Sequence, residues 1–286
     1  MNTTEQHEYV IERTTSWFRI PWRELLNYRD LLFLLVRRDF VSRYKQTILG
    51  PVWFILQPLL TTLIFTVVFK KMAGLSTDGY PGVVFYLSGM LAWQYFAQCM
   101  QGTSSTFVTN QNLFGKVYFP RLVVPLSVIM SNLLAFGLQF LTFLCFLFYF
   151  KFFSWSGELI APKWIIIILP LIILHAACLG LGVGLWMSAL TAKYRDFTHV
   201  SGFLTQLWMF GTLPLFMSIS DIDAKYQWIL SVNPVCPIVQ WYRFAFLGAK
   251  GFCIGQYGLS VAISLFLLIT GILVFSKTEK TFIDTV

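Results

Sequence analysis

Apolar residues recur every three or four positions over residues 25–45, and this spacing predicts a helix with one apolar face. The residues that share this face are Leu25, Tyr28, Leu32, Val36, Phe40 and Tyr44. The cations around it are Arg29, Arg37, Arg38, Arg43 and Lys45. A basic amphipathic helix of this kind lies in the headgroup region of a membrane, with its cations on anionic lipid. We therefore expect an N-terminal amphipathic interface helix within residues 25–49.

Long uncharged stretches follow, and their lengths predict membrane spans. Gly50-Pro51 breaks the first helix, and no residue from 52 to 69 is charged. At about 1.5 Å per residue this stretch nearly crosses a ~30 Å hydrocarbon layer. The predicted spans are about 52–69, 83–108, 122–150, 164–192, 197–220 and 256–276. The predicted fold is thus an all-α integral membrane protein with six transmembrane helices.

The fourth predicted span carries small residues at a spacing of four. Gly180, Gly184 and Ser188 share one helix face. Small residues let a second helix approach closely inside a membrane. We expect another helix to pack on this stripe.

The segment before the last span, about 226–250, is too interrupted to cross a membrane. Its uncharged part is broken at Asn233-Pro234 and again at Pro237. Such a segment predicts two half-helices that enter the outer leaflet and return, which is tolerated only against protein or a water-filled cavity.

Composition supports a membrane protein and gives its orientation. The chain is 57% hydrophobic and 12% charged, whereas soluble domains carry about 25% charged residues. Lys and Arg residues gather before the first span, and cations near a span stay cytoplasmic. We expect a multi-pass protein of the cytoplasmic (inner) membrane, with a cytoplasmic tail at residues 1–24 and both termini inside. Because the net charge of +8 is concentrated beside a span, its expected partner is membrane lipid and not nucleic acid.

The sequence shows no energy-converting chemistry of its own. Its one Gly-Lys pair, Gly115-Lys116, is followed by Val117 and not by Ser or Thr, so it is no phosphate-binding loop. HExxH and GxSxG motifs and Cys/His metal spacings are absent from the sequence. The acidic residues fall in tails, loops or the interface helix, which argues against an ion-coupled carrier. We expect a chain that is not an enzyme and uses no cofactor or metal, with energy supplied by a partner.

For a few polar residues in or near the spans, the sequence leaves two interpretations open. His175 is the one candidate for a proton relay, against a hydrogen-bonded structural role. Asp221 and Asp223 are the best candidates for convergent acids, against charges at the end of a span. Cys236 and Cys253 both fall on the predicted outer side, so a disulfide between them stays open.

Two motifs give the chain a family resemblance. The first runs from Arg38-Asp39 through Arg43-Tyr44-Lys45-Gln46-Thr47-Ile48-Leu49-Gly50-Pro51-Val52-Trp53 to Gln57-Pro58. The second joins Asn112-Leu113 to Lys116-Val117-Tyr118-Phe119-Pro120-Arg121. Weaker matches are Tyr194-Arg195-Asp196, Asn233-Pro234 and Glu279-Lys280-Thr281-Phe282. Over about residues 25–286 the chain resembles type-two ABC exporter permeases, and among them the polysaccharide exporters of the Wzm and KpsM kind and the teichoic-acid permeases.

The resemblance implies a homodimer that works with two copies of a separate nucleotide-binding ATPase and moves a lipid-linked polysaccharide. In that picture the loop around 110–120 docks in a cleft of the ATPase, and the interface helix also touches it. The residues given this coupling role are Asn112, Leu113, Phe114, Lys116, Tyr118, Phe119, Pro120, Arg38 and Arg43. The aromatic residues predicted to contact sugar are Trp53, Tyr86, Trp93, Tyr95, Phe96 and Trp208. The alternative for such aromatics is lipid contact and interfacial belts.

Two other functions stay open on the sequence. One is a type-two permease for drugs or small lipids, which has the same spans. The other is a membrane-embedded glycosyl- or acyltransferase, which would need acids such as Asp221 and Asp223 at the membrane surface.

Overall fold

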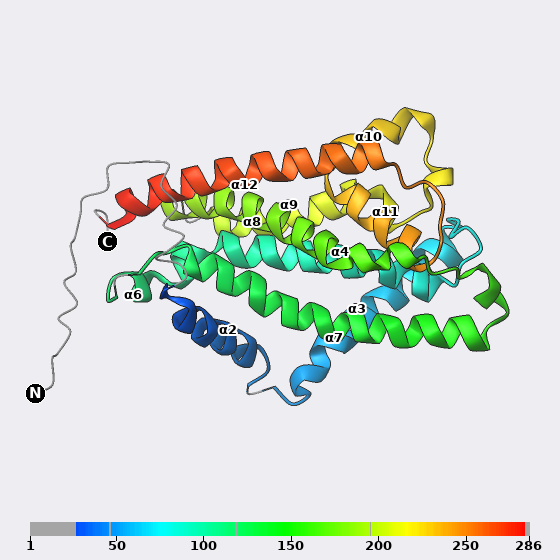
Figure 1. Cartoon of the computed structure of the whole chain (residues 1–286), viewed down its shortest axis with the longest axis horizontal. Coiled ribbons are helices and arrows are strands. Elements are labelled where there is room, and N and C mark those ends of the chain that lie inside the picture. Colours follow the sequence, from blue (N-terminus) through cyan, green and yellow to red (C-terminus); the bar gives the residue numbers. More distant parts are fainter. Residues whose placement is uncertain (1–26, 46, 118, 195, 284–286) are drawn as a thin grey trace, which may run out of the picture.

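The computed structural model describes residues 27–45, 47–117, 119–194 and 196–283, and within these ranges the regular structure is all helical. The long helices run side by side along one axis (Figure 1). The helices and helical turns are α2 (Arg29–Tyr44), η1 (Gly50–Val52), α3 (Trp53–Phe65), η2 (Thr66–Met72), α4 (Gly82–Ser104), α5 (Thr106–Thr109), α6 (Gln111–Phe114), α7 (Val123–Phe153), η3 (Trp155–Leu159), η4 (Trp164–Ile168), α8 (Leu169–Lys193), α9 (Phe197–Gly211), η5 (Leu213–Leu215), η6 (Ile219–Asp221), η7 (Ala224–Tyr226), α10 (Gln227–Val232), α11 (Val235–Phe246) and α12 (Ile254–Ile283). We call the end that carries α6 the α6 end, and the opposite one the α11 end.

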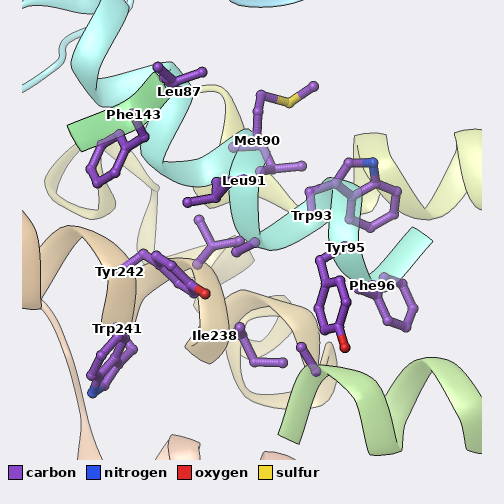
Figure 2. Packing of buried hydrophobic residues seen from close by; sticks show 14 of the residues in the cluster. Leu87, Met90, Leu91, Trp93, Tyr95, Phe96, Phe143, Ile238, Trp241 and Tyr242 are labelled. Carbon is purple, nitrogen blue, oxygen red and sulfur yellow. The ribbon is translucent and has the colours of Figure 1, made fainter. Parts of the chain in front are cut away.

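α4 is the central helix of the bundle. It packs against α3, α7, α8, α9 and α11, and most of its residues are buried. Figure 2 shows its large side chains meeting Phe143 of α7 and Tyr242 of α11. Because lipid tails are as apolar as a protein core, such a bundle is held by close packing and by hydrogen bonds, not by hydrophobic burial alone.

α8 lies between α4 and α12, and small residues on two of its faces allow this. A Cβ added to Gly180 would lie 2.8 Å from Cβ of Cys99, and one added to Gly184 would lie 2.6 Å from Cβ of Thr103. The predicted stripe is therefore confirmed as the contact with α4. The opposite face, which was not predicted, makes an equally close contact with backbone atoms: a Cβ on Gly182 would lie 2.6 Å from the backbone nitrogen of Leu268 in α12.

Four described helical segments are long and apolar enough to cross a membrane: Gly50–Met72, Val123–Phe153, Trp164–Lys193 and Ile254–Glu279. α4 is long enough, but polar residues such as Gln94 and Gln98 make it less apolar. The helix of the predicted fifth span ends early, at Gly211, and the chain then turns through short 3-10 segments around Pro214. The structure thus supports a multi-pass membrane protein, while the count of six spans stays a prediction.

The predicted interface helix is present as α2, and the chain bends after it at Gly50, whose φ is +53°. Its apolar residues pack against protein, because α2 lies beside α7 (Figure 1) and Leu35 is buried there. The two faces are less separated than predicted, since Phe33 and Leu34 are exposed beside the cations. Leu25 and the tail 1–24 lie outside the described residues.

The segment before α12 forms two short helices, α10 and α11, that meet at Asn233-Pro234 as predicted. The amide of Asn233 fixes this break: its Oδ1 accepts a hydrogen bond from the backbone N–H of Val235 at 3.0 Å. Pro237 is buried in the first turn of α11, where its missing N–H breaks no helical hydrogen bond. The depth of these helices in a membrane stays a prediction.

The cysteine pair that the sequence left open is not bonded. Cys236 is buried and Cys253 is exposed, and both thiols are free.

Candidate functional site

An aromatic cluster underlies the loop at the α6 end. The rings of Phe107 and Phe275 stack with centroids 4.7 Å apart, and Phe114 lies 5.9 Å from Phe107 and 5.8 Å from Phe119. Phe114 is 9% exposed and Phe119 is 4% exposed. In this conformation these two predicted coupling residues therefore anchor the loop from inside, and direct contact with a partner stays a prediction for both.

Arg121 ties the same loop to the end of α12. Its guanidinium carbon lies 5.1 Å from the centre of the Phe114 ring. Its Nη1 donates to the backbone carbonyl of Glu279 at 2.8 Å, and its Nε lies 3.9 Å from the Glu279 carboxylate. Sequence reasoning gave Arg121 no role of its own. A buried cation between an aromatic ring and a helix end holds the loop in place against α12, because the cation would be costly to leave unpaired.

Arg38 joins α2 to this loop. Its Nη2 lies 2.8 Å from the Asp39 carboxylate and donates to Oδ1 of Asn110 at 3.3 Å. Asp39 in turn accepts a hydrogen bond from Ser127 of α7 at 3.5 Å. The structure thus places Arg38, which the resemblance gave a coupling role, beside the loop, and the role itself stays a prediction. Arg43, given the same role, lies instead at a cavity beside Trp53.

The outer surface of the loop consists of Asn112, Gly115, Lys116 and Val117, which are all exposed, and we call this surface the α6 tip. Val117 is 54% exposed although it is apolar. Val117 was not among the predicted coupling residues. An aliphatic residue directly after Gly-Lys in a polar loop could have indicated a contact surface. Leu113 and Pro120 are half-buried. Tyr118 lies outside the described residues.

Four of the six aromatics predicted to contact sugar belong to the core. Tyr86, Trp93, Tyr95 and Phe96 of α4 are each 3% exposed or less. Figure 2 shows the last three among the packed side chains. In this conformation none of the four lines a surface. The reason is that the faces of α4 that carry these four residues are covered by neighbouring helices, which the sequence of one helix does not reveal.

The other two aromatics each reach a cavity, and Trp208 is the first. Its Nε1 donates to Oδ1 of Asn233 at 2.9 Å, and its ring meets Phe96 edge-on at 5.2 Å. A cavity of about 320 Å³ opens beside it. The lining residues are Trp208, Gly211, Trp228, Ile229, Val232, Asn233 and Pro234. The structure thus brings together the predicted sugar contact Trp208 and the predicted break residues.

Trp53 is 46% exposed and lies at the second cavity, of about 250 Å³, where α2, α3, α4 and α7 meet. We call this the Trp53 cavity. Its lining residues are Arg43, Gly50, Trp53, Phe54, Gln57, Pro58, Gln94, Gln98 and Gln139.

Comparison with known proteins fixes the family. Residues 30–247 match the sequence pattern of the ABC-2 type transporter. The chain belongs to the ABC-2 type transporter family. It is 28% identical over 256 residues to the O-antigen export system permease protein RfbA of Klebsiella pneumoniae, covering 89% of this chain and 94% of that protein. It is 29% identical over 226 residues to RfbA of Myxococcus xanthus, covering 78% of this chain and 83% of that protein.

A more distant relative extends across nearly the whole chain. The capsule polysaccharide export inner-membrane protein CtrC of Neisseria meningitidis serogroup B is 21% identical over 277 residues. The alignment covers 91% of this chain and 95% of that protein.

The remaining polar candidates of this ABC-2 chain have structural partners. Nδ1 of His175 lies 3.1 Å from the hydroxyl of Tyr257, and Nε2 lies 2.9 Å from the hydroxyl of Ser264. This favours the hydrogen-bonded interpretation over a proton relay. Asp221 is exposed and accepts a hydrogen bond from the backbone of Ser76 at 3.2 Å, which fits a loop contact. Among the described residues no group of three or more His, Cys, Asp or Glu could hold a metal ion.

Proposed function

We propose that this chain is the permease subunit of an ATP-driven exporter that moves a lipid-linked polysaccharide, of the O-antigen, capsule or teichoic-acid kind, across the cytoplasmic membrane. Family membership supports the transport role. The relatives named for O-antigen and capsule export, aligned over most of their length, support the cargo class. A separate ATPase supplies the energy, because the sequence has no phosphate-binding loop of its own.

The observation that carries the proposal is the construction of the α6 end. The α6 tip is exposed, whereas Phe114 beneath it is packed and Arg121 is bonded to the end of α12. A push on the tip is therefore transmitted to α12 and, through Arg38 and Asn110, to α2. This is the mechanical requirement for a surface on which an ATPase acts.

The topology proposed with it has six spans and both termini in the cytoplasm. α4 is the second span, enclosed by its neighbours and so free to carry polar residues. α9 with the turns after it is the fifth, and α10 and α11 return within the outer leaflet. The α6 tip then faces the cytoplasm, on the side where ATP is available.

The proposed assembly contains two permeases and two ATPases. α9 supports a second copy, since it keeps large apolar side chains exposed. Examples are Phe203 and Leu207. The conduit runs between the copies. Of the predicted aromatics, only Trp53 and Trp208 remain as candidates to meet the glycan.

The test is a substitution at the α6 tip. Val117→Asp places a charge in a surface proposed to be desolvated by the ATPase, and at a central interface position such a change costs about 2 kcal/mol or more. We expect at least about tenfold weaker retention of the ATPase by the purified permease, with loss of glycan export. Val117→Thr, which keeps the shape, is the matched control and should retain most binding.

Thermal stability of the isolated permease should be the same for both variants, because Val117 is exposed. Phe114→Ala gives the contrasting result: it removes a packed ring and should lower stability by about 3–5 kcal/mol. Unchanged ATPase retention and export in Val117→Asp would refute the coupling assignment.

A further inference from the structure

The Trp53 cavity has polar walls contributed by four separate helices. Arg43 comes from α2, Gln57 from α3, Gln94 and Gln98 from α4, and Gln139 from α7. Four amides from three helices line one cavity of an otherwise apolar bundle. Packing does not explain them, because an apolar side chain would fill the same space at lower cost.

The polar groups of the cavity have few partners within the described part of the chain. Gln139 is only 5% exposed, and none of the hydrogen bonds found there involves its side chain. Gln94 accepts a long hydrogen bond, 3.4 Å, from Nε2 of Gln98. The Nε2 of Gln94 and the Oε1 of Gln98 have no hydrogen-bond partner among the described residues. A buried amide without a partner costs about 1–3 kcal/mol. The cavity therefore presents amide groups with unused hydrogen-bonding capacity to a polar occupant.

Arg43 adds a positive charge at the rim. It forms no ion pair with any described acid. Partial burial lowers the pKa of its guanidinium and the charge of Asp39 opposes this shift, yet an arginine stays protonated at physiological pH. A guanidinium in this situation is suited to a phosphate, which it binds through paired N–H donors.

Trp53 gives the cavity a flat apolar wall. Next to it Phe54 is held by stacking on Phe40 of α2 at 5.5 Å. Paired amides match the donor and acceptor pattern of sugar hydroxyls, and an aromatic face matches the C–H side of a sugar ring. At about 250 Å³ the cavity is smaller than the 300–1,000 Å³ of typical drug-sized sites. It suits one ring and not a chain.

The cavity also lies beside a surface for a lipid tail. Its lining includes Gly50 and Trp53 at the bend between α2 and α3. Figure 1 shows this bend beside α7. Along α3 beyond the cavity, Leu60, Leu63 and Ile64 are exposed. A ligand with an anionic sugar head and an apolar tail can place the head among the glutamines and the tail along α3.

We propose that the Trp53 cavity binds a sugar phosphate carried on a lipid, the phosphate at Arg43 and the sugar ring between Trp53 and the amides of Gln94 and Gln139. This rests on the proposed function, in which the cargo is a lipid-linked glycan. The site then selects the lipid-proximal sugar before transport begins.

The experiment measures binding to the full permease–ATPase complex in lipid nanodiscs. The probe is a short polyprenyl phosphate that carries one hexose. Gln139→Leu removes the buried amide with little change of volume, and Arg43→Gln removes the charge at a partly exposed position. Each should weaken probe binding about five- to tenfold, the effect of one hydrogen bond or one charged contact. Gln101→Leu, on the exposed side of α4, is the matched control and should change binding less than twofold.

Three competitors separate the sources of the ligand. The same polyprenyl phosphate without sugar should compete poorly, and so should the free hexose phosphate, because each lacks half of the recognised group. Bilayers rich in phosphatidylglycerol should also leave binding intact. If phosphatidylglycerol displaces the probe fully, the cavity is a site for bulk lipid and the proposal is overturned.

Retention of wild-type binding in both cavity variants would also overturn the proposal and leave the cavity as a water-filled space. Thermal stability of each variant is measured alongside, so that loss of fold is not mistaken for loss of binding. Failure of the proposed function looks different: the wild-type complex itself would neither bind the probe nor export glycan.

Discussion

Gly182 offers a sharp test of the packing described above. A Cβ added there would lie 2.6 Å from the backbone nitrogen of Leu268 and 2.8 Å from the carbonyl carbon of Leu267. Both are backbone atoms of α12, so no side chain can rotate to make room. The carbonyl oxygen of Gly182 also lies 2.6 Å from the site of a Cβ on Gly271, which shows that the two helices touch through their backbones.

The size of the effect follows from a comparison with Gly137. A Cβ on Gly137, in the middle of α7, would have no heavy atom within 4 Å. Gly→Ala in a helix gains up to about 1 kcal/mol from helix propensity at either position. Only Gly182→Ala incurs the cost of overpacking, about 1–3 kcal/mol. The two variants should therefore differ by that amount, with Gly182→Ala the less stable.

Stability can be measured by thermal unfolding of the purified permease in one detergent, with retention of a monodisperse elution profile as the readout. Gly137→Ala should be at least as stable as wild type. Gly182→Ala should unfold several degrees lower, and Gly182→Leu lower again. Equal stability of the two alanine variants would refute the claim that α8 and α12 are in backbone contact at Gly182.

Three further outcomes are expected. Arg121→Leu should destabilise the α6 end and lower the stimulation of the ATPase. Glu279→Gln should have little effect, because Arg121 also bonds the backbone carbonyl of Glu279. The activity of the co-purified ATPase checks both variants. Asp78→Ala should make the loop between η2 and α4 sensitive to protease added from the proposed outer side. The change removes the acceptor for the hydroxyl of Ser218 and places alanine at a φ of +50°. Similar cleavage of the wild-type protein would contradict this prediction. His175→Leu should cost about 1–3 kcal/mol in a thermal unfolding assay, since it removes the bonds of the imidazole to the buried hydroxyl of Ser264 and the half-buried hydroxyl of Tyr257.

Periodic apolar patterns in the sequence predicted the helices well, because length and the absence of charge are properties of one segment. Gly180 and Gly184 were recognised by spacing alone, and Asn233-Pro234 by the missing N–H of proline. The contact at Gly182 was not recognised, because small residues alternate through this part of α8 and the sequence does not say which helix each face meets.

The candidate sites were harder to predict than the helices. The family resemblance gave Phe114 a docking role. Its orientation depends on an aromatic cluster in which Phe107 stacks on Phe275, and Phe275 comes from a distant part of the chain. For the same reason an aromatic such as Phe96 could be core, lipid-facing or conduit-lining by sequence alone. Gln139 carried no motif, and its meaning appears only when α3 and α4 are placed around it.

The glycine contacts of α8 also decide where motion can occur. Helices that touch backbone to backbone cannot shear past one another without passing through a clash at every turn, so α4, α8 and α12 must move as one rigid body. α3 is different, since only 11% of its membrane-crossing stretch is buried within the chain. We therefore expect α3 to move relative to α4, α8 and α12 during transport. A cross-link between α3 and α4 should stop transport, whereas a cross-link between α8 and α12 should leave transport unchanged.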